Sequence, residues 1–198
     1  NQFGIHYCDM VLANNDWAKG VKKRFTVLYN DEWNMLCNDC SKIYSSLDSN
    51  LIKLIQIIDY RDKFYRDMLN NSNRDMAKQT KLDSINGVAI DSLISIYGYV
   101  GISLVGSRYK NVCWSVIQHN PIKFQKKHFN MLKKASQNDE MSKSNIAYSE
   151  DRIMVHDCKK QKYGTQYYFD ELTNKNEIYQ LIDPKQVDEK FPGTITIE

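Results

Sequence analysis

The sequence of 198 residues is poor in the features that define the major non-globular classes. No apolar run is longer than a few residues, so no segment is predicted to span a bilayer. Lys and Arg number 27 against 24 Asp and Glu, a surplus too small to imply a nucleic-acid or membrane partner by itself. Only 3 residues are proline, and the hydrophobic (42%) and charged (26%) fractions exclude disordered and fibrous proteins. The composition predicts a soluble chain with one domain, or one domain and a helical annex.

Cysteine is also scarce, with an odd count of 5 that does not fit a disulfide scaffold. Cys37 and Cys40 have the C-x-x-C spacing of zinc sites and redox dithiols, but no second such pair completes a tetrahedral site. The simpler interpretation makes them neighbours on one helix face. They remain weak metal candidates, and no cofactor is predicted.

No signal peptide is recognisable at the start of the sequence. The chain begins at Asn1 and shows neither a basic region nor a continuous apolar segment of the kind found in a leader. Two locations are therefore left open: the cytoplasm, or export after removal of a leader.

Helical periodicity divides the chain in two. Residues 1–48 are polar and aromatic with weak periodicity, and we predict an N-terminal helical annex there. Residues 49–198 are predicted to form a helical domain, whose strongest helix starts from an N-cap at Ser49-Asn50. The apolar stripe of that helix contains Leu51, Leu54, Ile55, Ile58, Tyr65 and Leu69.

The following segments predict more helices and a hairpin. Polar residues 70–82 predict a loop with a helical start, and the glycines after Tyr97 predict a tight turn with an extended or loop segment. Helices are expected over 83–97, 107–119, from Pro121 to Ala135, and over 145–156. Strand-forming residues on both sides of a turn predict a β-hairpin over 163–182, followed by a short helix at 183–187. The fold class is mainly α (α+β): a helical bundle-like domain with a C-terminal β-hairpin and a short final helix.

An acid and a base interrupt the apolar stripe of the first helix. Asp62 lies four residues after Ile58, and Arg66 lies four residues after Asp62. Because buried charges must be paired, the two either form a structural bridge or line a polar pocket between helices.

Several polar motifs follow one another at spacings that resemble a bacterial family of unknown function. The pattern of that family contains D-Q-x-x-R, Y-G-W-P, Q-H, D-R and Y-G-T-Q, and the resemblance covers about residues 50–192. This chain departs from it with Lys63 in place of Gln, with Tyr99-Val100 in place of Trp-Pro, and with His156-Asp-Cys-Lys in place of a glycine. The matching segments are Asp62-Lys-Phe-Tyr-Arg66, Tyr97-Gly-Tyr-Val-Gly101, Leu104-Val-Gly106, Trp114-Ser-Val-Ile-Gln-His119, Ala147-Tyr-Ser-Glu-Asp-Arg152, Gln161-Lys-Tyr-Gly-Thr-Gln166 and Ile182-Asp-Pro184.

The residues of these motifs are mostly polar, as in a pocket or a buried polar network. His119 is the one obvious proton-transfer group, and Asp62 or Asp151 could fix its tautomer. Arg66 and Arg152 would suit a carboxylate or phosphate, because a guanidinium binds such groups with two parallel hydrogen bonds. The remaining candidates for ligand binding are Gln118, Tyr163, Thr165 and Gln166.

No covalent nucleophile stands out, since the sequence has neither a G-x-S-x-G motif nor an evident Cys–His arrangement. The H-E-x-x-H motif of zinc enzymes is absent as well. A structural network, a binding pocket and an enzyme remain possible. Among functions, we expect a binding or interaction domain for an unknown small molecule or protein, with a polar site around His119, Asp151, Arg152 and Gln166. The alternative is an acid–base or hydrolytic enzyme that uses His119 with an aspartate and with an arginine that binds an anion. It requires that His119 is not sealed in the core away from these groups, because catalytic groups need hydrogen-bond reach or one bridging water. Nucleic acid is not expected, since the basic stretch 123–134 fits a solvated helix face.

Overall fold

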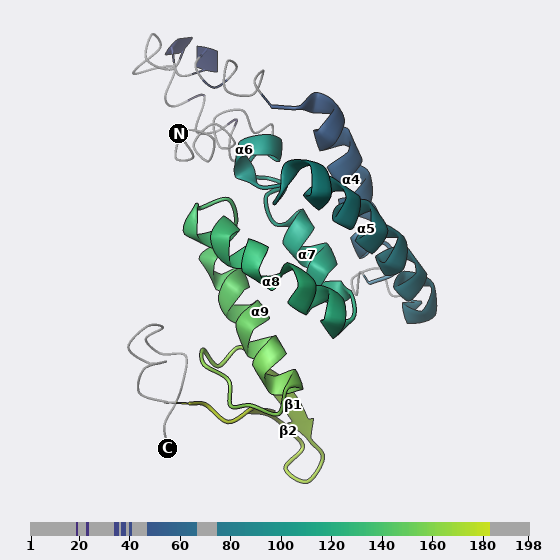
Figure 1. Cartoon of the computed structure of the whole chain (residues 1–198), viewed down its shortest axis with the longest axis vertical. Helices are drawn as coiled ribbons and strands as arrows, with labels where there is room; N and C mark the ends of the chain where they lie inside the picture. The colour runs from purple at the N-terminus through teal and green to yellow at the C-terminus, as the bar shows by residue number, and fades with distance from the viewer. Residues whose placement is uncertain are drawn as a thin grey trace.

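The computed structural model describes residues 47–66 and 75–182, together with positions 19, 23, 34, 35, 37, 38 and 40. The predicted annex over 1–48 lies outside the described residues apart from these positions and residues 47 and 48, and so does the predicted final helix at 183–187. The described part contains six helices followed by one two-stranded hairpin (Figure 1). The predicted fold class, mainly α with a C-terminal hairpin, is confirmed.

The first two described helices, α4 (Ser49–Lys63) and α5 (Met76–Tyr97), pack against each other. Helix α4 starts from Asp48, whose side chain accepts hydrogen bonds from two backbone N–H groups of the first turn, so the predicted cap at Ser49-Asn50 was wrong. Helix α5 starts from Asp75, so the loop predicted for 70–82 was wrong from residue 76 onward. The first turns of α5 bury polar side chains, and apolar periodicity could not reveal them.

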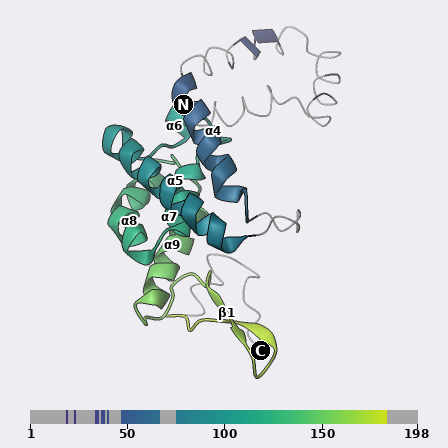
Figure 2. The ribbon, with the colours of Figure 1, turned by 90° about the vertical axis from the view of Figure 1, so that its right-hand side faces the viewer.

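Helix α7 (Val112–His119) lies between the α4–α5 pair and the helices α8 (Ile122–Gln137) and α9 (Lys143–His156) (Figures 1 and 2). Its predicted start at 107 was five residues early. The segment after Gly101, predicted as extended or loop, contains a single helical turn, α6 (Ile102–Val105), where Glu140 accepts from N–H groups at 102 and 103.

The hydrophobic core surrounds α7. The helix contributes Val116 and Ile117, both without exposed surface, and these pack with Ile58 of α4 and Ile90 of α5. Helix α8 adds Leu132. Because this core holds α4, α5 and α7 together, polar side chains at the ends of these helices are brought close to one another.

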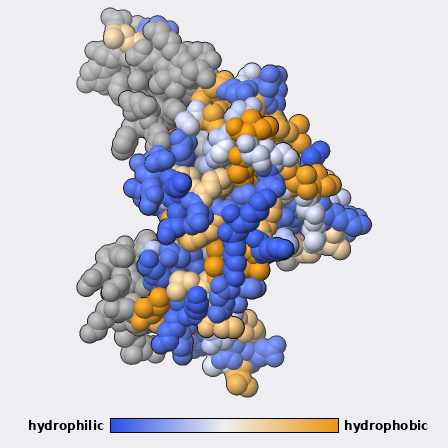
Figure 3. Space-filling model, in the orientation of Figure 1, coloured by the Kyte–Doolittle hydropathy of each residue, from blue (hydrophilic) through white to orange (hydrophobic). Residues whose placement is uncertain are grey.

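The hairpin consists of β1 (Tyr167–Asp170) and β2 (Lys175–Ile178), paired antiparallel with Tyr167 opposite Ile178. It follows α9 at the end of the molecule far from α6, and most of its side chains are exposed (Figure 1). Polar residues cover much of the face seen in Figure 3, and apolar ones gather over the α4–α5 end. None of the described helices is long and apolar enough to cross a membrane.

Candidate functional site

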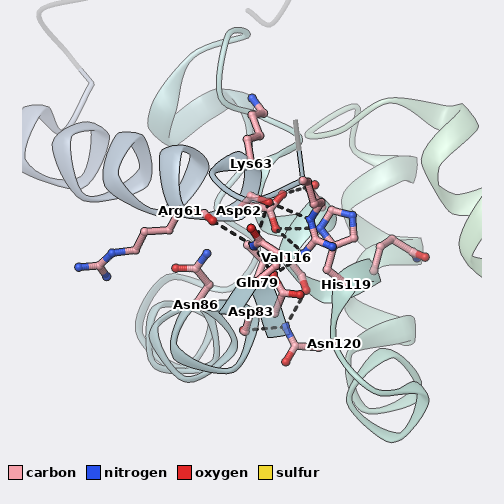
Figure 4. Close-up of polar contacts among 12 residues, drawn as sticks. Arg61, Asp62, Lys63, Gln79, Asp83, Asn86, Val116, His119 and Asn120 are labelled. Carbon is pink, nitrogen blue, oxygen red and sulfur yellow. Dashed lines mark hydrogen bonds and ion pairs between the residues drawn. The ribbon is translucent and has the colours of Figure 1, made fainter. Parts of the chain in front are cut away.

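A cluster of polar side chains lies where the last turns of α4 and α7 meet α5 (Figure 4). His119 Nδ1 lies 2.7 Å from Asp62 Oδ1, and the Ser115 hydroxyl donates to Asp62 Oδ2 at 2.9 Å. The Asp62 side chain is only 3% exposed, whereas that of His119 is 30% exposed. A buried carboxylate therefore holds one nitrogen of a partly exposed imidazole ring.

Residues of the same cluster bind the guanidinium of Arg66. Its Nε donates to the Asp62 carbonyl at 2.8 Å, and its Nη2 pairs with the Asp83 carboxylate and lies 3.8 Å from Asp62 Oδ1. Gln79 donates to the Asp83 carboxylate at 2.8 Å and to the Asp62 carbonyl at 3.2 Å. Because two carboxylates of the protein already face this guanidinium, it is poorly placed to bind an external anion.

Gly87 allows α7 to approach α5 closely beneath this cluster. The Asn120 side chain donates to the Asp83 carbonyl at 3.1 Å and to the Val116 carbonyl at 2.8 Å. A Cβ atom at position 87 would lie 2.6 Å from Asn120 Oδ1, well inside van der Waals contact. The absence of a side chain at Gly87 thus lets Asn120 join the two helices.

The surroundings of Asp62 keep its carboxyl group ionised. Burial by itself raises the pKa of this group, but the hydrogen bond from His119, the charge that His119 carries when protonated, the Ser115 hydroxyl and the charge of Arg66 together outweigh burial. The pKa of Asp62 is therefore lowered from its ordinary value of 3.8. An ionised Asp62 can only accept, so it receives the hydrogen of His119 Nδ1.

Asp151, the other candidate acid, belongs to a different cluster. Its carboxylate has no exposed surface and accepts from the N–H groups of Lys162, Tyr163 and Thr165 and from the Thr165 hydroxyl, at 2.6–3.1 Å. All of its hydrogen bonds among the described residues go to this loop, and none goes to His119. Asp151 therefore anchors the segment that leads from α9 into the hairpin.

Gln166 and the buried Gln161 complete the base of the hairpin. Gln161 Oε1 accepts from the Gln166 N–H at 2.9 Å, and its amide donates to the carbonyls of Gln166 and Tyr179. The Gln166 side chain itself donates to the Thr165 hydroxyl at 3.1 Å. Thr165 and Gln166 thus bind to the hairpin base rather than to the His119 cluster.

Gln118 and Arg152 link α7 to α9. The buried Gln118 amide donates to the Ser149 hydroxyl at 2.5 Å, and Arg152 Nη1 lies 3.5 Å from Gln118 Oε1. Because Gln118 directly precedes His119, Arg152 lies at the same end of α7 as the His119–Asp62 pair.

Of the candidates from the sequence, the structure thus groups Asp62, Arg66 and His119. The sequence interpretation missed Ser115, Gln79, Asp83 and Asn120. One available signal was the spacing of the buried polar residues of α5, because Gln79, Asp83 and Asn86 precede Ile90 at helical intervals on one face.

The C-x-x-C pair is not a reduced dithiol. Cys40 is disulfide-bonded, whereas Cys37 carries a thiol. The sulfur of Cys40 is therefore not available as a thiolate ligand. In the part of the chain that the structure describes, no group of three or more His, Cys, Asp or Glu side chains could hold a metal ion.

Comparison with known proteins defines the family. Neither the curated proteins nor the solved structures provide a match to this chain. The model of DUF6624, a family of unknown function, matches residues 59–190, from the last turns of α4 past the end of the hairpin. The expected resemblance to a family of unknown function is thereby confirmed, and the chain belongs to DUF6624.

Proposed function

We propose that this protein is an acid–base catalyst in which His119 accepts a proton from a small-molecule substrate or from water. The observation that carries the proposal is the 2.7 Å contact between His119 Nδ1 and the buried Asp62 carboxylate. With Nδ1–H held by Asp62, the other ring nitrogen, Nε2, carries the lone pair of the neutral ring. Among the described residues, Nε2 has no hydrogen-bond partner.

The charges of the cluster favour this direction of proton transfer. Asp62 and Asp83 carry two negative charges, and Arg66 carries one positive charge. With a neutral His119 the cluster has a net charge of −1, and it becomes neutral when His119 accepts a proton. The buried carboxylates therefore stabilise the imidazolium that forms during the reaction.

A purely structural role explains the cluster less well. Burying two carboxylates against one guanidinium has a large desolvation cost, and well-packed apolar residues at such positions are often equally or more stabilising. A structural histidine is usually buried, whereas the imidazole ring of His119 is partly exposed at the edge of this cluster. Both features support a chemical role for His119.

The surroundings favour chemistry without a covalent intermediate. The Ser115 hydroxyl donates its hydrogen to Asp62, so it is not activated by His119. The Cys113 thiol is fully buried, and burial raises its pKa to about 12, so it stays protonated at neutral pH. Activation of water, or removal of a proton from the substrate, is the remaining use of His119.

Two measurements on the whole chain test the proposal. Long-range ¹⁵N–¹H NMR should show His119 as the Nδ1–H tautomer, and Asp62→Asn should change that pattern. Diethyl pyrocarbonate, which acylates an accessible lone pair, should modify His119 and the exposed His156 much faster than the buried His128. An Nε2–H tautomer in the wild type, or a His119 as unreactive as His128, would overturn the proposal.

Turnover is then sought with panels of model esters, amides and phosphoesters. We expect any activity of the wild type to be lost in His119→Gln and reduced in Asp62→Asn, because positioned proton transfer contributes about 10²–10⁴-fold in rate. His156→Gln is the matched control and should leave the activity unchanged, because this histidine lies at the end of α9 beside Asp157. Activity retained in His119→Gln contradicts the assignment.

An interaction domain is the second candidate, supported by the exposed apolar side chains of the hairpin. Tyr167, Phe169 and Leu172 are 55%, 57% and 97% exposed. Exposed aromatic residues of this kind are typical of protein contact surfaces. This alternative predicts that Tyr167→Ser with Phe169→Ser abolishes binding of a purified partner while the circular dichroism spectrum is unchanged; unchanged binding contradicts it.

A further inference from the structure

We infer that the substrate of the proposed His119 centre is an anion whose carboxylate or phosphate group is bound by Arg152. This inference rests on the proposed function and adds the chemical class of the substrate. The sequence leaves two arginines open for this role, Arg66 and Arg152. The two arginines differ in whether carboxylates of the protein already neutralise the charge of the guanidinium.

Arg66 is used by the protein itself. Its guanidinium faces the carboxylates of both Asp83 and Asp62, and its Nε is bound to a backbone carbonyl. An incoming anion would have to displace Asp83 from a partly buried ion pair, at a substantial cost.

Arg152 has no such partner. Its single hydrogen bond among the described residues is a long one, 3.5 Å to the neutral Gln118 Oε1, and it forms no ion pair there. The neighbouring carboxylates are engaged elsewhere, since Asp151 binds the loop at 162–165 and Glu150 lies 3.6 Å from Lys162 Nζ. A guanidinium has five N–H donors in a planar fork, so most donors of Arg152 remain for a ligand.

The contact with Gln118 places the Arg152 guanidinium at the end of α7 that carries His119. Gln118 is fixed by Ser149 on one side, and its backbone carbonyl accepts from the buried Gln125 amide at 3.1 Å. The Oε1 atom of Gln125 is also buried and has no donor among the described residues. A buried acceptor without a partner calls for a donor, which a hydroxyl group of a ligand or a water molecule can supply but the anionic group itself cannot.

Titration with simple anions tests the inference. Inorganic phosphate and acetate are added separately at constant ionic strength to the ¹⁵N-labelled chain, and the ¹⁵N–¹H signals are followed. We expect saturable shifts around Gln118, His119 and Arg152 with at least one anion, and the comparison of the two separates phosphate from carboxylate recognition. In Arg152→Gln the Kd should rise about tenfold or more, since a bidentate charge-assisted contact is lost, and Arg152→Lys should be intermediate.

Arg108→Gln is the matched control. Arg108 also lacks an ion pair among the described residues, but it lies over the Tyr109 ring before α7, so its loss should leave the Kd unchanged. Circular dichroism and thermal unfolding verify that each variant is folded. An equal Kd in the wild type and Arg152→Gln, or no saturable shift with either anion, would overturn the inference.

The His119 tautomer, measured on the same samples, separates this inference from the proposed function. If the Nδ1–H tautomer is present but neither anion binds through Arg152, only the substrate class is wrong. If anions bind through Arg152 but His119 has the other tautomer, the acid–base proposal is wrong and the anion site stands.

Discussion

The contacts of Asp62 with His119 and Ser115 allow a quantitative prediction of the change in the free energy of unfolding. Asp62 accepts from His119 at 2.7 Å and from Ser115 at 2.9 Å, with its side chain only 3% exposed. Net contributions of hydrogen bonds to charged groups are about 1.5–3 kcal/mol each, and asparagine retains part of this bonding capacity. We therefore expect Asp62→Asn to lower the free energy of unfolding by about 2–3 kcal/mol, roughly one charged hydrogen bond.

Helix α4 offers a matched control for this substitution. Asp59 pairs with Lys63 at 2.7 Å, also at i and i+4, but the Lys63 side chain is 66% exposed. Such surface pairs contribute only about 0.3–0.5 kcal/mol, so Asp59→Asn should be nearly neutral. Urea unfolding at neutral pH, followed by circular dichroism and tryptophan fluorescence, measures both variants.

A double-mutant cycle isolates the contact itself. Asp62→Asn and His119→Gln together should cost less than the sum of the single variants, with a coupling energy of about 1–2 kcal/mol. Costs that add within about 0.5 kcal/mol, or an Asp62→Asn effect as small as that of Asp59→Asn, would refute the reasoning. The proposed orientation of His119 by Asp62 would then lose its energetic support.

Three further predictions concern other parts of the fold. Gly87→Ala should lower the free energy of unfolding by about 1–3 kcal/mol, because the new Cβ would lie 2.6 Å from Asn120 Oδ1, and thermal unfolding measures this. Asp151→Asn should speed hydrogen exchange of the amides at 162–165, with a local loss of about 2–3 kcal/mol; unchanged exchange would deny its role as an anchor. Burial raises the Cys113 pKa from 9.0 to about 12, so the unfolded state deprotonates first and stability falls as the pH rises across that range; Cys113→Ala should flatten this fall in urea titrations.

The helices were predictable where one face is apolar. The stripe from Leu51 to Ile58 identifies α4, and the register of Val112 and Val116 identifies the buried face of α7. The hairpin was predictable because its strand formers surround a turn. Apolar periodicity reports burial only when the buried side chains are apolar, and this condition fails at the start of α5.

The polar face of α5 explains why the site was only half predictable. Gln79 and Asp83 are buried against Asp62, on α4, and Arg66, in the turn after α4, so the burial of each segment depends on polar residues of the other. Each segment read separately therefore suggests a loop or an interrupted stripe, and only the two together describe a buried polar layer. The role of Ser115 was even harder to predict, because a single hydroxyl near the end of a helix has no distinguishing sequence pattern. The charged pair that interrupts the apolar stripe predicted for the first helix was thus the informative feature, because a charge at a core position requires a complementary partner elsewhere in the chain.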